Sequence, residues 1–142
     1  MIYTNLTKQA LKLCFEAHKE QVDKSGMPYV FHPFHLAEQM TDEATTVVAL
    51  LHDVVEDTDT TFEDLEKQGF SDEIIKALML LTHEKSVPYM EYVGEIKKNK
   101  IATKVKLADL KHNSDLSRLD TVDEKALKRK EKYENAIKIL EE

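Results

Sequence analysis

The sequence has few of the residues that interrupt or cross-link a chain. Its 142 residues include three glycines, three prolines, one cysteine and no tryptophan. So few turn-forming residues argue against a β-sandwich or barrel, which needs frequent turns between short strands. The single cysteine, Cys14, excludes an internal disulfide and points to a reducing, cytoplasmic compartment. Because Cys14 lies in an apolar helical stripe, we expect a buried small hydrophobe rather than a nucleophile.

Long apolar runs and an excess of positive charge are also missing. The formal net charge is -7, which argues against a nucleic-acid-binding surface. No apolar run approaches the roughly 20 residues that span a bilayer, and residues 1–5 lack the pattern of a signal peptide. A hydrophobic fraction of 42% and the length predict one globular domain over residues 1–142, with no nucleic-acid or membrane partner.

Apolar residues recur at three- and four-residue spacing along most of the chain, which predicts an all-α fold. Asp42 and Ser71 are expected N-caps, and capping boxes are expected at 60–63 and 121–124. Met79 and Leu127 are expected to face inward, and His18 to be a structural histidine bonded to the backbone. About eight helices follow, at residues 4–22, 33–40, 43–56, 61–69, 72–81, 88–98, 100–113 and 122–141.

The stretch Leu50–Asp57 combines an apolar run with four polar groups. On a continuous helix, His52 and Glu56 are i,i+4 neighbours, and so are Asp53 and Asp57. Three carboxylates and an imidazole are thus crowded beside a segment hydrophobic enough to be core. Because unpaired charges at the edge of a core are costly, a bound divalent cation is the simplest compensation.

Two other positions could complete a metal site. His32 lies at a helix entrance beside Pro33, and Asp109 lies among apolar residues in the segment 104–113. Taken alone, Asp109 could equally be a buried aspartate bonded to a helix N-terminus or to a lysine. With His52 and Asp53, they supply two imidazoles and two carboxylates, which suits Mn²⁺, Fe²⁺ or Zn²⁺. Four protein ligands on an octahedral ion leave positions for water and a phosphate oxygen, as a hydrolase requires.

Three blocks of sequence, PYVFHP, ALLHDVVEDTDTT and VKLADLKHN, resemble the hydrolase domain of RelA/SpoT-type (p)ppGpp hydrolases and small alarmone hydrolases, within the HD-domain metal phosphohydrolases. The resemblance covers about residues 18–113. It implies an HD-type helical bundle and removal of the 3′-pyrophosphate of (p)ppGpp, giving GDP or GTP and pyrophosphate. It also implies one Mn²⁺ held by His32, His52, Asp53 and Asp109, a role for Glu56 and Asp57 toward the attacking water and the phosphates, and substrate contacts by Lys24, Ser25, Tyr29 and Asn113.

The nucleoside end departs from that family. Such hydrolases typically carry Arg-Lys-Ser where this chain has Asp23-Lys24-Ser25, and Met-Arg-Thr-Leu where it has Ser-Asp-Leu-Ser at 114–117. Two alternatives therefore stay open: an HD phosphohydrolase for another small nucleotide, such as a nucleoside monophosphate or dinucleotide phosphate, or a catalytically silent binding module. No synthetase half is expected, because only the charged segment of about 122–141 remains beyond the motifs.

Overall fold

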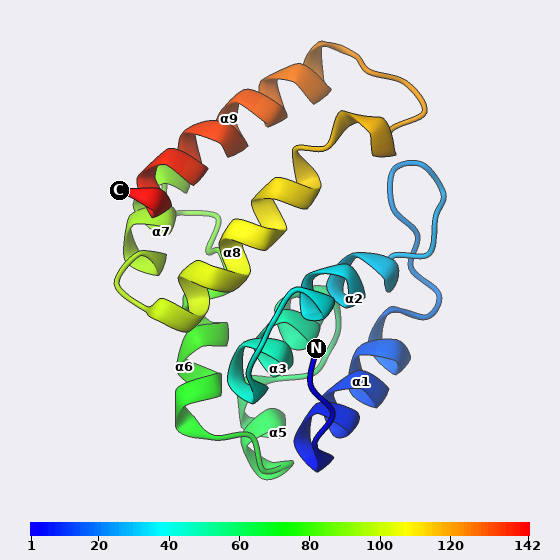
Figure 1. Cartoon of the computed structure of the whole chain (residues 1–142), viewed down its shortest axis with the longest axis vertical. Coiled ribbons are helices and arrows are strands. Elements are labelled where there is room, and N and C mark those ends of the chain that lie inside the picture. Colours follow the sequence, from blue (N-terminus) through cyan, green and yellow to red (C-terminus); the bar gives the residue numbers. More distant parts are fainter.

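The computed structural model describes residues 1–142 and is helical throughout, which confirms the predicted all-α class (Figure 1). None of its helices is both long and apolar enough to cross a membrane. In chain order the elements are α1 (Asn5–His18), α2 (Phe31–Glu38), α3 (Glu43–Leu51), α4 (Val54–Asp57), α5 (Phe62–Lys67), α6 (Asp72–Leu81), α7 (Tyr89–Ile96), α8 (Lys100–Asn113), the 3₁₀-helix η1 (Leu116–Arg118) and α9 (Glu124–Glu141).

Helix α3 is the centre of the fold. It packs against α1, α2, α6 and α8, and every residue from Thr45 to Leu51 is buried. A helix that is apolar on all sides is stable only when neighbours surround it, and each fully buried leucine adds roughly 1.5–3 kcal/mol. Figure 1 shows α8 and α9 side by side along one edge, with the C-terminus near α7. The central helix thus delivers His52, the next residue, to the interior.

The expected continuous helix over 43–56 is wrong. It divides into α3 and α4 at His52 and Asp53, which explains nine α-helices where about eight were expected. The ψ angle of Asp53 is 0°, far from the value near −42° of a regular helix, so the chain changes direction there. The four polar groups of this stretch are therefore not arranged as on one helix.

The helix starts are partly as predicted. Asp42 and Ser71 accept hydrogen bonds from backbone N–H groups as N-caps, which confirms both. The expected boxes at 60–63 and 121–124 are misplaced, because Thr61 forms its box with Asp64, and Asp123 caps α9. In both cases a residue with a side-chain acceptor lies closer to the first helical turn.

The surroundings of four side chains correct three expectations and confirm one. Met79 and Leu127 are 55% and 53% exposed, so both inward assignments are wrong. Cys14 is buried in the core, as predicted, and burial raises the pKa of its thiol to about 12, as does the charge of Asp53. His18 is buried, but its Nδ1 bonds the side chain of Gln21 at 2.8 Å instead of a backbone group.

Candidate metal centre and adjoining cavities

Three of the expected ligands meet in the interior. His32, His52 and Asp109 come from α2, the end of α3 and α8, and one potential ligand atom of each lies within 4.8 Å of the others. The Nε2 atom of His32 is 2.8 Å from Asp109 Oδ1, and that of His52 is 3.7 Å from the same oxygen. All three side chains are buried. Two imidazole nitrogens and a carboxylate oxygen around one point are a donor set that suits a divalent transition metal.

The orientation of His52 supports this assignment. Its Nδ1 lies 2.7 Å from the carbonyl oxygen of Ala49, so Nδ1 is the donor and Nε2 is the nitrogen left to bind a metal ion or a second proton. Nε2 is buried without a well-formed hydrogen bond, although Asp53 Oδ2 is only 3.0 Å away. A lone pair facing carboxylates needs a cation between them, and the residues present therefore fit a metal ion.

The electrostatics of the site lead to the same conclusion. Burial alone would lower the pKa of His52, but the nearby carboxylates of Asp53 and Asp109 raise it well above its usual value. Burial alone would raise the pKa of Asp53, but His52 outweighs burial and lowers it to about 2. In the absence of a metal, the site attracts a proton to the position between these groups.

Asp53 lies beside the three-residue cluster. Its Oδ2 accepts a hydrogen bond from the hydroxyl of Tyr29, a residue that the resemblance assigned to the substrate. Burial raises the pKa of Tyr29 above its usual value, and so do the charge of Asp53 and this hydrogen bond. The tyrosine therefore stays protonated and acts as a donor toward Asp53.

Asp109 is also bonded to a lysine. The alternative interpretation of Asp109, a buried aspartate paired with a lysine, therefore holds together with its place in the cluster. Lys106 Nζ donates to Oδ2 at 3.0 Å, and Asn113 Nδ2 donates to Oδ1 at 3.1 Å. Burial alone would raise the pKa of Asp109, but Lys106 and the two histidines hold it well below its usual value. The carboxylate is thus ionised and fixed in position, as a metal ligand should be.

His112 contacts His32, and the sequence interpretation did not predict this contact. Nδ1 of His112 lies 2.7 Å from Nδ1 of His32, and its ring stacks on the ring of His35 with the two ring centres 4.1 Å apart. Burial, then the charge of Arg118 and the nearby histidines, lower the pKa of His112 to about 4. A neutral imidazole there can accept the Nδ1 proton of His32 and so leave Nε2 of His32 free for a metal. Its place in the block VKLADLKHN, one residue before Asn113, was the available signal.

The two acidic residues of α4 point to different places. Glu56 lines a small cavity of about 100 Å³ with His52, Asp53 and Asp109, and its Oε1 accepts the backbone N–H of His83 at 2.8 Å. Asp57 lines a separate shallow depression and accepts a hydrogen bond from Gln21. The structure therefore brings Glu56, but not Asp57, into the cavity beside the metal cluster.

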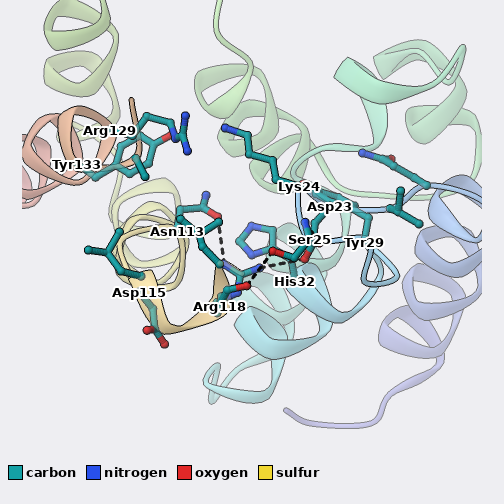
Figure 2. A pocket seen from close by; sticks show the side chains of 15 residues that line it. Asp23, Lys24, Ser25, Tyr29, His32, Asn113, Asp115, Arg118, Arg129 and Tyr133 are labelled. Carbon is teal, nitrogen blue, oxygen red and sulfur yellow. Dashed lines mark hydrogen bonds and ion pairs between the residues drawn. The ribbon is translucent and has the colours of Figure 1, made fainter. Parts of the chain in front are cut away.

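A second cavity, of about 340 Å³ and larger than the one that Glu56 lines, opens next to His32 (Figure 2). All four residues expected to contact substrate line it: Lys24, Ser25, Tyr29 and Asn113. The sequence interpretation missed five more polar residues in its wall: Gln21, Asp115, Arg118, Arg129 and Tyr133. Partial burial, and next the charge of Arg129, lower the pKa of Lys24, which indicates cations gathered around an open space. This size and lining suit a small anionic ligand with an apolar part.

Comparisons with known proteins agree with this geometry. The family model described as "HD domain" matches residues 10–112. A guanosine-3′,5′-bis(diphosphate) 3′-pyrophosphohydrolase of Aquifex aeolicus is 37% identical over 92 residues, which cover 62% of this chain and 13% of that protein. The corresponding enzyme MESH1 of Danio rerio is 36% identical over 96 residues, covering 62% and 53%. The chain therefore spans about half, or much less, of the length of these curated relatives.

A solved structure agrees over nearly the whole chain. The metazoan ortholog of SpoT, described as hydrolysing ppGpp, superposes with a TM-score of 0.76 and 28% identity, covering 99% of this chain and 85% of that one. The helical fold is therefore the fold of that hydrolase. With the family match over residues 10–112 and the His32, His52 and Asp109 cluster, the chain belongs to the HD-domain family.

Proposed function

We propose that the chain is a Mn²⁺-dependent phosphohydrolase that removes the 3′-pyrophosphate of (p)ppGpp, giving GDP or GTP and pyrophosphate. The observation that carries the proposal is the buried cluster of His32, His52 and Asp109 between two cavities, one of them large enough for a nucleotide. The choice of substrate is supported by the curated relatives named for this reaction and by the solved structure of a protein described as hydrolysing ppGpp.

The proposed ligands are His32, His52, Asp53 and Asp109. A divalent cation held there would acidify water and offset the negative charge of the phosphate chain under attack. Mn²⁺ is favoured because it accepts both imidazole and carboxylate ligands and commonly keeps open positions. Lys106 and Asn113 keep Asp109 in place, and His112 keeps the Nε2 atom of His32 directed at the cluster.

Glu56 is the better placed of the two proposed catalytic carboxylates. One of its oxygens is held by the N–H of His83, which leaves the other to orient a water molecule or to accept its proton. Burial raises the pKa of Glu56, the hydrogen bond from His83 opposes this rise, and the charges of Asp53 and Asp57 add to it, which strengthens Glu56 as a proton acceptor. Asp57 is proposed to act from the edge of the site, where Gln21 holds it.

Glu56→Gln tests this division of roles. We expect the metal content to be retained and turnover to fall by about 100-fold, as for loss of a general base. Asp57→Asn, the adjacent and similar change, should have a smaller effect. Pyrophosphate release from ppGpp in Mn²⁺, together with elemental analysis of the purified protein, measures both quantities. Full activity of Glu56→Gln would refute its role, and wild-type release no faster than background would refute the proposed reaction.

Asp23 favours a second candidate, hydrolysis of another small nucleotide. This carboxylate lines the larger cavity in place of the cation that the family usually has. Orthophosphate release from a panel of nucleoside monophosphates and dinucleotide phosphates, run beside the ppGpp assay, separates the two reactions. A silent binding module would show neither activity and no bound metal.

A further inference from the structure

Arg118 occupies an unusual position in this molecule. The chain has 18 lysines but only two arginines, and both arginines line the larger cavity. Arg118 lies at the end of η1, and its side chain contacts the turn that begins at Asp23. We propose that the guanidinium of Arg118 is the platform on which the base of a bound nucleotide stacks, and that Asp23 positions it. The inference rests on the proposed nucleotide substrate and adds a residue that determines its recognition.

The guanidinium is held by its edge. Its Nη1 donates to the carbonyl oxygen of His112 at 2.9 Å and lies 3.4 Å from Asn113 Oδ1. Its Nη2 lies 3.9 Å from Asp23 Oδ2. Three acceptors thus hold the two terminal nitrogens, and the side chain stays 27% exposed in the wall of the larger cavity, where we place the face that a ligand contacts. Guanidinium faces stack on aromatic rings and nucleobases, and a face held in one orientation loses little entropy on binding.

Asp23 is itself fixed by the turn. Its Oδ1 accepts the backbone N–H groups of Ser25 at 2.9 Å and Met27 at 3.0 Å, which leaves Oδ2 directed at Arg118. The hydroxyl of Ser25 donates to the carbonyl oxygen of Arg118 at 3.1 Å. Two segments more than 90 residues apart are therefore joined at this wall, and Figure 2 shows Arg118 between Asn113 and this turn.

The surroundings of Arg118 match a nucleotide rather than a simple anion. Leu116 and Leu119 line the same cavity and provide apolar surface next to the guanidinium. Lys24 and Arg129 line it too, and Figure 2 shows their cationic ends in the same region. A ligand with a flat ring at Arg118 and phosphates toward these cations and His32 uses each of these features.

Binding of two probes tests the proposal. Calorimetric titrations with GDP and with inorganic pyrophosphate, both in Mn²⁺, separate the base from the phosphates. Arg118→Lys keeps the charge and removes the flat face, so we expect about tenfold weaker GDP binding with unchanged pyrophosphate binding. Asp23→Asn can keep the turn bonds at Oδ1 but loses the ion pair, and should weaken GDP binding less. Urea unfolding of each variant shows that it is folded.

Catalysis supplies a second readout. With ppGpp, Arg118→Lys should raise KM about tenfold while kcat changes little, because the base is remote from the metal cluster. The proposal is overturned if wild-type protein does not bind GDP, if Arg118→Lys binds GDP normally, or if it loses pyrophosphate binding in parallel. Failure of wild-type protein to hydrolyse ppGpp, with the GDP result as expected, would refute the proposed reaction and leave the role of Arg118 standing.

Discussion

Removal of the Lys106 ammonium is the perturbation whose cost can be worked out most directly. The side chains of Lys106 and Asp109 are only 13% and 8% exposed, and their charged atoms are 3.0 Å apart. The ammonium also lies 5.3 Å from the centre of the Tyr92 ring. Breaking a buried ion pair by removing one partner costs about 3–5 kcal/mol, because the other charge stays buried. Asn113 and His32 still bond Asp109, which places Lys106→Met at the lower end of this range.

We therefore expect Lys106→Met to lower the free energy of unfolding by about 3 kcal/mol in EDTA, equivalent to a fall in Tm on the order of 10 °C. The matched control is Lys98→Met, which removes the ammonium from a pair with Glu95 that is 71% and 61% exposed. Such a surface pair contributes about 0–1 kcal/mol. Urea unfolding followed by circular dichroism measures both variants.

The same experiment in Mn²⁺ tests whether Asp109 is a metal ligand. A bound cation would supply part of the positive charge that Lys106 supplies, so the difference between Lys106→Met and wild type should shrink by about 1 kcal/mol or more. The control, Lys98→Met, should show no such dependence. A Lys106→Met protein that unfolds like wild type in EDTA would refute the buried-pair argument. An equal difference with and without Mn²⁺ would refute Asp109 as a ligand.

Two further predictions concern the metal site and the helix cap. His112→Phe removes the acceptor at Nδ1 of His32, so the affinity for Mn²⁺, measured by titration, should fall about 10- to 100-fold. The control, His35→Phe, changes the exposed ring that stacks on His112 and should alter the affinity little. Equal effects of the two changes would refute the role of His112. Asp42→Ala should cost about 1 kcal/mol near neutral pH, measured by urea unfolding. Hydrogen bonds from Thr45 lower the pKa of Asp42, so its stabilisation is complete above the ordinary value of 3.8 and disappears as pH falls through the lowered folded value. A cost that is the same at pH 7 and below pH 3 would contradict this account.

Much of the fold could be predicted because helix periodicity and capping are local. The segment of α6 follows from apolar spacing and its cap Ser71, and that of α8 from apolar spacing alone, since its cap Asn99 was not predicted. The division at Asp53 could not be predicted, because no proline or glycine marks it. The exposure of Met79 was also out of reach, since a helix with apolar residues on several sides does not reveal which of them finds a neighbour.

The candidate site divides in the same way. The residues His32, His52 and Asp109 could be named from their types and from the sequence blocks around them, and the structure brings them together. Their supports could not be named. His112 and Lys106 read as ordinary surface residues of an amphipathic helix until α2, α3 and α7 pack around α8.

By itself the sequence determined the helical class, the candidate metal-binding side chains and the departure at Asp23, because these depend on residue type and on spacing within a few turns. Only the tertiary structure decided that Glu56 and Asp57 face different spaces. It also decided that Asp23 meets Arg118, since a contact between segments more than 90 residues apart depends on how the helices pack. Burial then sets the charge states of the site, because a carboxylate or imidazole acquires its pKa from neighbours that the linear chain does not reveal.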